Sequence, residues 1–312
     1  MKCSDLSNKY IVNPTWELTP QIFISPFSAQ NLEEDDGLSS IPQAKAYLDK
    51  RFGNYSLSLK GRQAIYEVLL NYSLEPDDVV TIYTTSDNFY ISRCVTDAIE
   101  RVCKWSRKIE DRTRLIFVNH EFGYPCQKMA SIASLGYPII EDRAHTFLTD
   151  DNLHEMGKYA DYVIYSLPKA LPFQIGAVIT SEKYPLHTKF NGPAENYILG
   201  KLSHYVDEID VIKKQRLHNY HFFENNLREL GAQPFFELEE GVVPGVFLFK
   251  WDTSIDYPKL KEFMQANGIE SSVFYGAPAF YIPCHQSLTS GQCEYILLLI
   301  KYYYDHQDDK DF

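Results

Sequence analysis

Two stretches decide the fold: PIIEDRAH at 138–145 and ADYVIYSLPK at 160–169. Each contains a short apolar run with the length of a buried strand, and each run ends in polar residues. Asp142 closes the first run, and Lys169 follows the second. Because ligands of parallel α/β sheets bind at the carboxyl ends of strands, both side chains are candidates for one site. Taken alone, the pair is equally consistent with a salt bridge at the rim of the sheet.

Helical and strand patterns alternate around these stretches. Apolar residues recur at helical spacing in three segments, 61–72, 91–102 and 129–133. Short apolar runs of the kind found in strands lie at 79–83, 115–118, 138–140, 162–165 and 177–180. Apolar strands separated by helices predict an α/β fold, a mostly parallel sheet flanked by helices on both faces.

The rest of the chain suggests three further regions. The first forty residues, with the acidic run Glu33–Asp36, are interpreted as an N-terminal arm (1–40) before a large domain at 41–193. Residues 194–230 contain no proline and predict one long connecting helix or two consecutive ones. Strand patterns at 246–249 and 272–275, a helix closed by Asn267 and Gly268, and a last helix at 291–304 predict a small C-terminal α+β domain (231–312), whose acidic end we expect to fray.

Composition excludes several classes of protein. The 312 residues are 45% hydrophobic and 23% charged, which is typical of a globular chain and not of a disordered one. A formal charge of −12 argues against nucleic acid as a partner. We find no apolar run of about 20 residues, so no membrane partner is expected, and no secretory signal, so we expect a cytoplasmic protein. The six cysteines lack paired spacing, which favours reduced thiols and no metal site.

The common signatures of phosphate, metal and nucleophile sites are absent. The sequence has no glycine-rich dinucleotide fingerprint, no Walker lysine loop, no paired-histidine zinc helix and no nucleophile elbow. Dehydrogenase, ATPase and serine hydrolase functions are therefore disfavoured.

The sequence resembles the DegT/DnrJ/EryC1/StrS aminotransferases, which are PLP-dependent enzymes of fold type I that aminate keto sugars on nucleotide carriers. The resemblance is distributed over five segments from about Ser56 to Tyr304: Leu59–Ile65 with Pro76–Asp78, Val118–Gly123, Ile140–His145, Ser166–Lys169 and Ile282–Leu288.

The resemblance implies a role for individual residues toward pyridoxal 5'-phosphate. Lys169 would be the Schiff-base lysine, Asp142 would meet the pyridine nitrogen, and His145 would lie beside the phenolic oxygen. Gly61, Arg62 and Ser166 would bind the phosphate, and Phe89 would cover one ring face. Asn191, or alternatively Asn196, would reach the cofactor of a partner subunit, so a homodimer is expected.

The chain also departs from the family pattern. Lys60-Gly61-Arg62 stands where the family has Ser-Gly-Thr, so backbone N–H groups or Arg62 would have to replace the threonine hydroxyl. The loop between Ser166 and Lys169 is about two residues shorter than in the family, and 171–174 read Leu-Pro-Phe-Gln instead of a glycine-rich stretch. These departures, and a chain shorter than the family's, leave the substrate open.

Elementary chemistry explains why transamination needs such residues. A primary amine that can lose its proton is needed to hold an aldehyde, and Lys169 qualifies if burial and the cofactor's charge lower its pKa. A carboxylate such as that of Asp142 keeps the ring nitrogen of the cofactor protonated. His120 and His285 are candidates for the substrate side. Four aromatic residues either wall a sugar or belong to the core: Phe274, Tyr275, Phe280 and Tyr281.

Three functions remain open from the sequence. The first is an aminotransferase that takes an amino group from an amino acid such as glutamate and gives it to the keto group of a nucleotide-linked sugar. The second is a PLP-fold protein that has lost activity and acts as a binding or scaffold partner. The third is a PLP enzyme of another type, such as a dehydratase. For an anionic substrate, the basic pocket is expected at Lys60, Arg62 and Arg143.

Overall fold

The computed structural model describes residues 21–28, 31, 40–252 and 254–307. The chain divides into two compact units. One comprises Phe27–Lys213 and Glu239–Val243, and we call it the large unit. The other comprises Lys214–Leu238, Pro244–Phe312 and the segment that ends at Pro26, and we call it the small unit.

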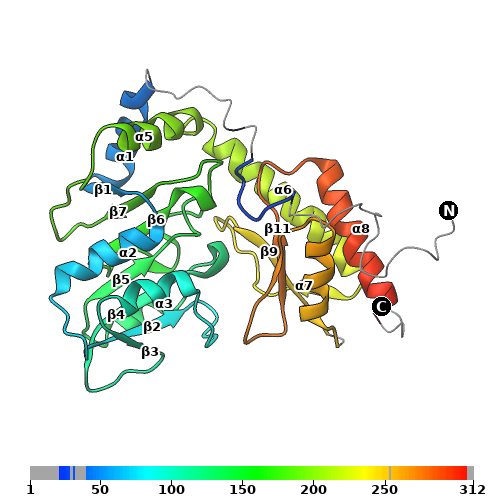
Figure 1. The fold of residues 1–312 in the computed structure, drawn as a ribbon, viewed down its shortest axis with the longest axis horizontal. Coiled ribbons are helices and arrows are strands. Elements are labelled where there is room, and N and C mark those ends of the chain that lie inside the picture. Colours follow the sequence, from blue (N-terminus) through cyan, green and yellow to red (C-terminus); the bar gives the residue numbers. More distant parts are fainter. Residues whose placement is uncertain (1–20, 29–30, 32–39, 253, 308–312) are drawn as a thin grey trace. The chain divides into compact units, whose positions relative to one another are not determined.

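A seven-stranded sheet forms the centre of the large unit (Figure 1). Its strands are β1 (Tyr55–Ser58), β2 (Val79–Thr84), β3 (Lys104–Ser106), β4 (Thr113–Asn119), β5 (Ile139–Asp142), β6 (Tyr162–Ser166) and β7 (Ala177–Thr180). They are ordered β1-β7-β6-β5-β4-β2-β3. Neighbours from β6 to β3 are parallel, whereas β7 is antiparallel to both β1 and β6. The carboxyl ends of β4, β5 and β6 therefore lie at one edge of the sheet.

Helices cover both faces of this sheet, because successive strand residues point to opposite sides. On β6, Ile164 packs with α2 (Gly61–Leu69) and α3 (Arg93–Glu100), whereas Tyr165 packs with α1 (Ile41–Phe52) and α5 (Pro193–Tyr205). The short α4 (Met129–Ala133) lies on the face opposite α2 and α3. Burial on both faces explains why these strands are apolar throughout their length.

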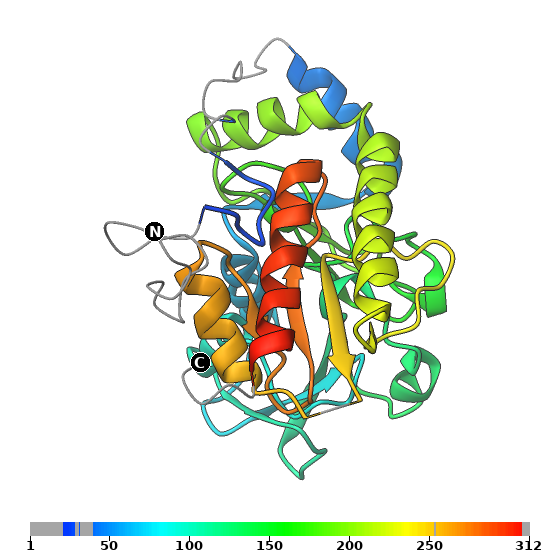
Figure 2. The ribbon, with the colours of Figure 1, turned by 90° about the vertical axis from the view of Figure 1, so that its right-hand side faces the viewer.

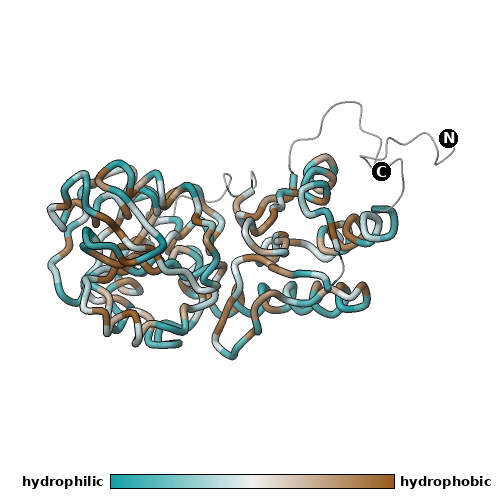
Figure 3. The backbone as a smooth tube through the Cα atoms, turned by 90° about the horizontal axis from the view of Figure 1, so that it is seen from below, coloured by the Kyte–Doolittle hydropathy of each residue, from teal (hydrophilic) through white to brown (hydrophobic). Residues whose placement is uncertain are grey.

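Local sequence sets where several helices begin. Ser92 caps α3 by accepting from the N–H of Cys94, and Thr289 forms a capping box with Gln292 at the start of α8 (Ser290–His306). Helix α2 differs, because its N-cap residue is Lys60 and makes no side-chain cap. The first N–H groups of α2 are therefore left to other partners. Figure 3 shows apolar and polar residues alternating along the helices of both units.

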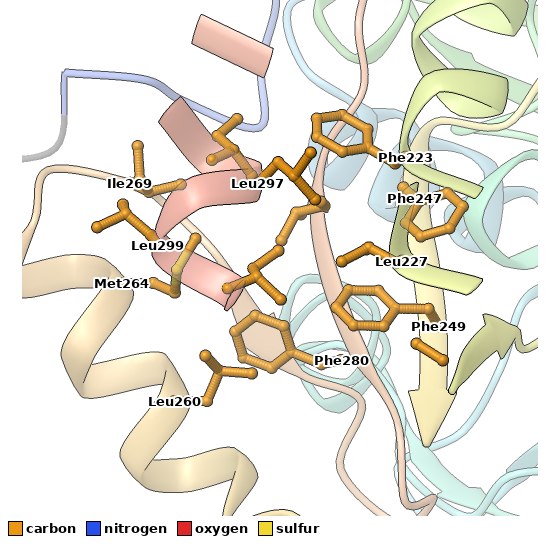
Figure 4. Close-up of a cluster of buried hydrophobic side chains, with 14 of the residues drawn as sticks. Phe223, Leu227, Phe247, Phe249, Leu260, Met264, Ile269, Phe280, Leu297 and Leu299 are labelled. Atoms are coloured by element: carbon orange, nitrogen blue, oxygen red, sulfur yellow. The ribbon is translucent and has the colours of Figure 1, made fainter. Parts of the chain in front are cut away.

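The small unit is an antiparallel sheet covered by helices. Its strands are β8 (Ala232–Pro234), β9 (Val246–Trp251), β10 (Ser272–Val273) and β11 (Phe280–Pro283), in the order β10-β11-β9-β8. Helix α8 lies across strands β9 and β11, with α7 (Tyr257–Ala266) beside it (Figure 2). Aromatic and aliphatic side chains fill the core between them, among them Phe247, Phe249 and Phe280 (Figure 4).

The predicted fold class is confirmed: a mostly parallel sheet flanked by helices, with a small C-terminal α+β part. The segment 194–230 forms two helices, α5 and α6 (Ile209–Arg228), which was one of the two alternatives. Strand β10 is shorter than the predicted 272–275. Helix α1 and strands β1, β3, β8 and β11 were not predicted. Most of the predicted arm, including Glu33–Asp36, and the end at 308–312 lie outside the described residues.

Within the described part of the chain, no helix combines the length and apolar character needed to cross a bilayer. Five cysteines are described, all as free thiols, and Cys94 is the exposed one among them. Cys3 lies outside the described residues.

Candidate active site

Three adjacent strand ends build the candidate site in the large unit. Strand β4 ends at Asn119, β5 ends at Asp142, and β6 ends at Ser166. Asn119 and Asp142 are paired in the register of the sheet. Because these strands are parallel neighbours, their terminal side chains gather at the edge where α/β sheets bind ligands.

Asp142 is a buried carboxylate held by neighbouring donors. Its Oδ2 accepts from Asn119 Nδ2 at 3.0 Å, and its Oδ1 accepts from the backbone N–H of Ala144 at 3.0 Å. Burial raises the pKa of Asp142, while the charge of Lys169 and the Ala144 N–H act in the opposite direction. The carboxylate is thus fixed in orientation and within electrostatic reach of Lys169.

Lys169 stands on the turn that follows β6. Ser166 precedes a single 3-10 turn, Leu167–Lys169, and the first residue of this turn, Leu167, is fully buried. Water reaches the Lys169 side chain, but protein atoms surround its amine on most sides, and this loss of hydration lowers its pKa. Asp142 and Cys94 counteract the lowering of the pKa. The amine is therefore placed to lose its proton more readily than a surface lysine.

The lysine contacts a histidine. Lys169 Nζ lies 2.5 Å from His145 Nε2, within hydrogen-bonding distance. His145 belongs to the segment that follows β5, three residues after Asp142. The ring of Phe122 packs on His145 with 5.8 Å between ring centroids. One site thus joins a carboxylate, an amine and an imidazole from the ends of two strands.

The start of α2 lies beside Ser166 at the end of β6. A Cβ placed on Gly61 would lie 3.4 Å from Ser166 Cβ and 3.6 Å from Ser166 Oγ. The N-terminus of α2 and the Ser166 hydroxyl therefore border the same space. N–H groups at a helix start, together with a hydroxyl, are a donor set that suits a phosphate.

Arg62 and Cys94 lie beside this donor set. Arg62 is exposed in the first turn of α2, and its Nη2 lies 3.1 Å from Cys94 Sγ in the first turn of α3. Cys94 is close enough to Lys169 to influence the pKa of its amine. Lys60 is exposed as well.

A buried polar pair lies on the same two strands as Asn119 and Asp142. His120 Nε2 donates to Glu141 Oε2 at 3.1 Å, because His120 Nδ1 is occupied by the N–H of Cys126 at 2.9 Å. His120 is 1% exposed and both its ring nitrogens have partners. The interpretation of His120 as a substrate-side residue is therefore wrong, and its role is to hold strands β4 and β5 together.

The expected basic pocket is only partly present. Arg143 is buried, and its Nη2 donates to Asp151 Oδ1 at 2.8 Å. Asp151 also binds Arg51, so both guanidinium groups are committed to one carboxylate. The prediction that Arg143 meets an anionic substrate is wrong, because its charge is already paired inside the large unit. Arg62 and Lys60 remain exposed at the start of α2.

Other predicted residues lie at the surface or in another unit. Phe89 is 69% exposed in the loop after β2, and Asn191 and Asn196 are exposed near the start of α5. His285 belongs to the small unit, where it is buried; Ser287 N–H donates to its Nδ1, and its Nε2 donates to Phe23 O. Burial lowers the pKa of His285 to about 3, and the charge of Arg216 adds to the effect.

The aromatic stretch resolves into two kinds of residue. Phe274 and Phe280 are buried, and Phe280 is part of the core of the small unit, so these two are core residues. Tyr275 is 42% exposed and Tyr281 is half-buried.

Sequence reasoning missed the residues that orient the site. Asn119 was quoted as part of a motif without a role, although its place at the end of the strand beside Asp142 is a usable signal. Phe122 has a left-handed backbone (φ 54°, ψ 19°), which no sequence pattern indicated. Cys94 was predicted only to be one of six reduced thiols, and no role at the site was predicted for it.

Comparisons with known proteins bear on the fold. No protein-family model matches the sequence, and no curated protein matches it. The structure, in contrast, matches solved aminotransferases over most of their length. One is a DegT DnrJ EryC1 StrS aminotransferase from Brucella abortus, with TM-score 0.65 and 14% identity over 85% of this chain and 90% of that one.

Two further solved structures are similar. The sugar aminotransferase CalS13 from Micromonospora echinospora matches with TM-score 0.61 and 15% identity, covering 84% of this chain and 91% of that one. NtdA from Bacillus subtilis, solved with the cofactor PMP bound, matches with TM-score 0.66 and 15% identity, covering 95% of this chain and 88% of that one. The chain therefore has the fold of PLP-dependent aminotransferases of fold type I, and its structural neighbours include DegT/DnrJ/EryC1/StrS sugar aminotransferases.

Proposed function

We propose that this chain is a PLP-dependent aminotransferase. One observation carries the proposal: the Lys169 amine, the Asp142 carboxylate and the start of α2 meet at adjacent strand ends, in a fold shared with solved aminotransferases. Fold alone does not define an activity, so the chemistry of these side chains is the stronger support.

The residues present fit pyridoxal 5'-phosphate. The phosphate has a donor set at Gly61, Arg62 and Ser166, because Lys60 makes no side-chain hydrogen bond to the first N–H groups of α2 and Gly61 lies beside Ser166. The ring nitrogen has a carboxylate in Asp142, and the aldehyde has an amine in Lys169. Arg62 stands where the resembled family has threonine, so a guanidinium replaces a hydroxyl and adds positive charge for a dianionic phosphate.

Each residue has a distinct task. When bound, pyridoxal phosphate supplies an aldehyde and a ring that accepts electrons. Lys169 binds the aldehyde carbon through its amine and afterwards can hold and move a proton at its Nζ. Asp142 favours the protonated ring nitrogen, and Asn119 fixes the direction of the carboxylate. Ser166 and the first N–H groups of α2 orient the phosphate.

We propose an amino acid such as glutamate as the donor and the keto group of a nucleotide-linked sugar as the acceptor. Support comes from the structural likeness to sugar aminotransferases and from the exposed cations Arg62 and Lys60, which locally oppose a chain charge of −12.

A two-stage spectroscopic experiment tests the function. The purified protein is loaded with pyridoxal phosphate, and its visible band is followed while glutamate and then a keto sugar nucleotide are added. We expect the band to fall with glutamate and to return with the keto sugar, and we expect neither change in Lys169→Ala. If the protein binds the cofactor but its visible band does not change with any amino donor, the proposed activity is contradicted.

The alternative function is a PLP-fold protein that has lost transamination and acts as a binding partner. The replacement of threonine by Arg62 and the shortened turn before Lys169 are the observations that favour it. The presence of both Asp142 and Lys169 argues against this alternative, since a scaffold has no chemical need for this pair. The same experiment separates the two functions.

A further inference from the structure

The contact between Lys169 and His145 has a chemical consequence. An ammonium group has three N–H donors and no lone pair, so it cannot bind an aldehyde until it loses a proton. The proton needs an acceptor within about 3 Å. His145 Nε2 lies 2.5 Å from Lys169 Nζ, and imidazole is the side chain whose ordinary pKa is nearest neutrality.

We propose that His145 is the catalytic base that takes the ammonium proton of Lys169. In this step the Nζ–H bond breaks, an Nε2–H bond forms on His145, and the electron pair stays on Nζ as its lone pair. Charge is conserved, because the positive charge moves from the ammonium to the imidazolium. Asp142, three residues before His145, is the nearby carboxylate that offsets the charge of the pair.

The structure holds the imidazole in place through a strained turn. Phe122 packs on the His145 ring from a left-handed conformation, which costs energy in a bulky residue. Thr85 fixes this turn, because its Oγ1 accepts from Glu121 N–H at 3.0 Å and donates to Tyr124 O at 2.8 Å. Thr149 Oγ1 donates to Gly123 O at 2.8 Å. We therefore assign Phe122 as the positioning residue for His145.

Other ionisable groups lie near the pair. Asp142 on β5 and Cys94 on α3 both act on the Lys169 amine, and both favour its charged form. Arg62 on α2 contacts Cys94, and His120 after β4 acts on Asp142. Among these groups, His145 is the one with a nitrogen in direct contact with the Lys169 amine.

The test measures the reactivity of the Lys169 amine without any cofactor. The protein is treated with a trace of acetic anhydride at several pH values, and acetylation of Lys169 and of the exposed Lys50 on α1 is quantified by peptide mass spectrometry. An ordinary amine loses about tenfold in reactivity for each pH unit below its pKa. A pair that shares one proton keeps a fraction of neutral amine that changes less steeply with pH.

In the wild type we expect the ratio of Lys169 to Lys50 labelling to rise as the pH falls from about 7 to about 5.5. In His145→Gln, the amide can accept the hydrogen bond but cannot take the proton, so the ratio should stay flat. At about pH 5.5 the variant should label Lys169 about fivefold to tenfold more slowly, and at about pH 8 nearly as fast as the wild type.

Two further variants separate this role from a structural one. Phe122→Leu should slow the labelling of Lys169 by about twofold to threefold and leave the shape of its pH profile unchanged, because the base is still present. Cys94→Ser should leave the shape of the profile unchanged, because the thiol is not the acceptor. A rising ratio in His145→Gln, or a flat ratio in the wild type, overturns the proposal. The wild-type profile decides the question even if His145→Gln does not fold.

The role of His145 as a catalytic base rests on the proposed aminotransferase function, whereas the labelling result does not. Labelling is done on the protein alone, whereas the proposed function is decided by the spectroscopic response to glutamate. A protein that shows the shared proton but does not respond to glutamate would keep the proton transfer from Lys169 to His145 and lose the proposed activity.

Discussion

A residue on the neighbouring strand orients the Asp142 carboxylate. Asn119 and Asp142 end adjacent parallel strands, so the amide of one reaches the carboxylate of the other at 3.0 Å. Burial raises the pKa of Asp142, which works against the ionised form that a protonated ring nitrogen needs. The Asn119 amide supplies part of the compensation, because a hydrogen bond to the ionised carboxylate favours it.

Removing that amide should weaken cofactor binding. In Asn119→Ala, Asp142 loses a hydrogen bond to a charged group, which is worth about 1.5–3 kcal/mol. We expect the dissociation constant for pyridoxal phosphate to rise about tenfold to a hundredfold, measured by a titration of cofactor absorbance. An unchanged constant, with an unchanged thermal midpoint, would show that Asn119 does not act on Asp142.

The buried imidazole of His285 should make the stability of the protein depend on pH. Its folded-state pKa of about 3 lies below the unfolded value of about 6.5, so between these values the unfolded chain binds more protons. The contribution of neutral His285 to the free energy of unfolding is therefore fully present above about pH 6.5. It is lost as the pH falls toward 3, by about 1.4 kcal/mol per pH unit. Urea unfolding at several pH values should show this slope in the wild type and a shallower slope in His285→Gln. Equal slopes in both proteins would place the acid sensitivity elsewhere.

Residue-level prediction from sequence had a clear limit. Asp142 and Lys169 could be singled out because strand ends are visible as the ends of apolar runs. The partners of Asp142 and His145 could not, because Asn119 depends on the register of β4 and β5, and Phe122 depends on a left-handed turn. Arg143 was misjudged because Asp151, eight positions later, folds back to bind it.

At the scale of elements, the turn between β6 and β7 positions Lys169. Leu167 N–H donates to Gly176 O at 3.0 Å, and Gly176 N–H donates to Leu59 O at 2.8 Å. Gly176 has φ 131°, and a Cβ there would lie 3.2 Å from Leu167 Cδ1 and 3.3 Å from Ile198 Cγ2. Glycine is needed here both for its backbone angle and for space.

Gly176→Ala should therefore destabilise the large unit. Strain at this φ together with overpacking costs about 2–4 kcal/mol, and displacement of Leu167 should also lower the occupancy of the cofactor. The matched control is Gly291→Ala in α8, where a Cβ would meet nothing within 4 Å and a helical alanine is favoured. Urea unfolding should show a loss in the first variant and no loss in the control. Equal stabilities in the two variants would refute the role given to Gly176.

Strongly patterned elements were predictable, and short ones were not. Strands β2, β4 and β6 and helices α2 and α3 carry apolar patterns long enough to be recognised. Strands β3 and β8 have three residues each, too few for periodicity to be visible. Helix α1 was missed as well, although it is not short: Ile41, Ala44 and Leu48 recur at helical spacing and pack in the core of the large unit.

At the scale of the whole molecule, the sequence predicted the class of fold but not which residues form each unit. Residues 239–243 belong to the large unit although the chain around them belongs to the small one. A backbone bond from Asp150 N–H to Gly241 O and a contact of His154 with Glu239 hold this segment there. A short segment that packs with a distant part of the chain leaves no local pattern in the sequence.

The expected homodimer with sites shared between subunits can be tested by mixing variants. We expect Asn191 to serve the site of the partner subunit, so Lys169→Ala and Asn191→Ala should each be inactive, whereas hybrids of the two contain one intact site. Refolding an equal mixture should restore about a quarter of the wild-type activity, since half of the dimers are hybrids. No recovery, or a monomer that turns over substrate, would contradict the assignment of Asn191, and the same mixing with Asn196→Ala tests the alternative.

Lys169 is proposed as the amine that holds the cofactor. The most direct measurement is to load the protein with pyridoxal phosphate, reduce it with borohydride, and locate the added mass among the tryptic peptides. We expect one fixed cofactor per chain, on Lys169, and none in Lys169→Ala, while Lys183→Ala on the surface behaves as the wild type. The same adduct retained in Lys169→Ala, or an adduct on another lysine, would show that Lys169 does not hold the cofactor.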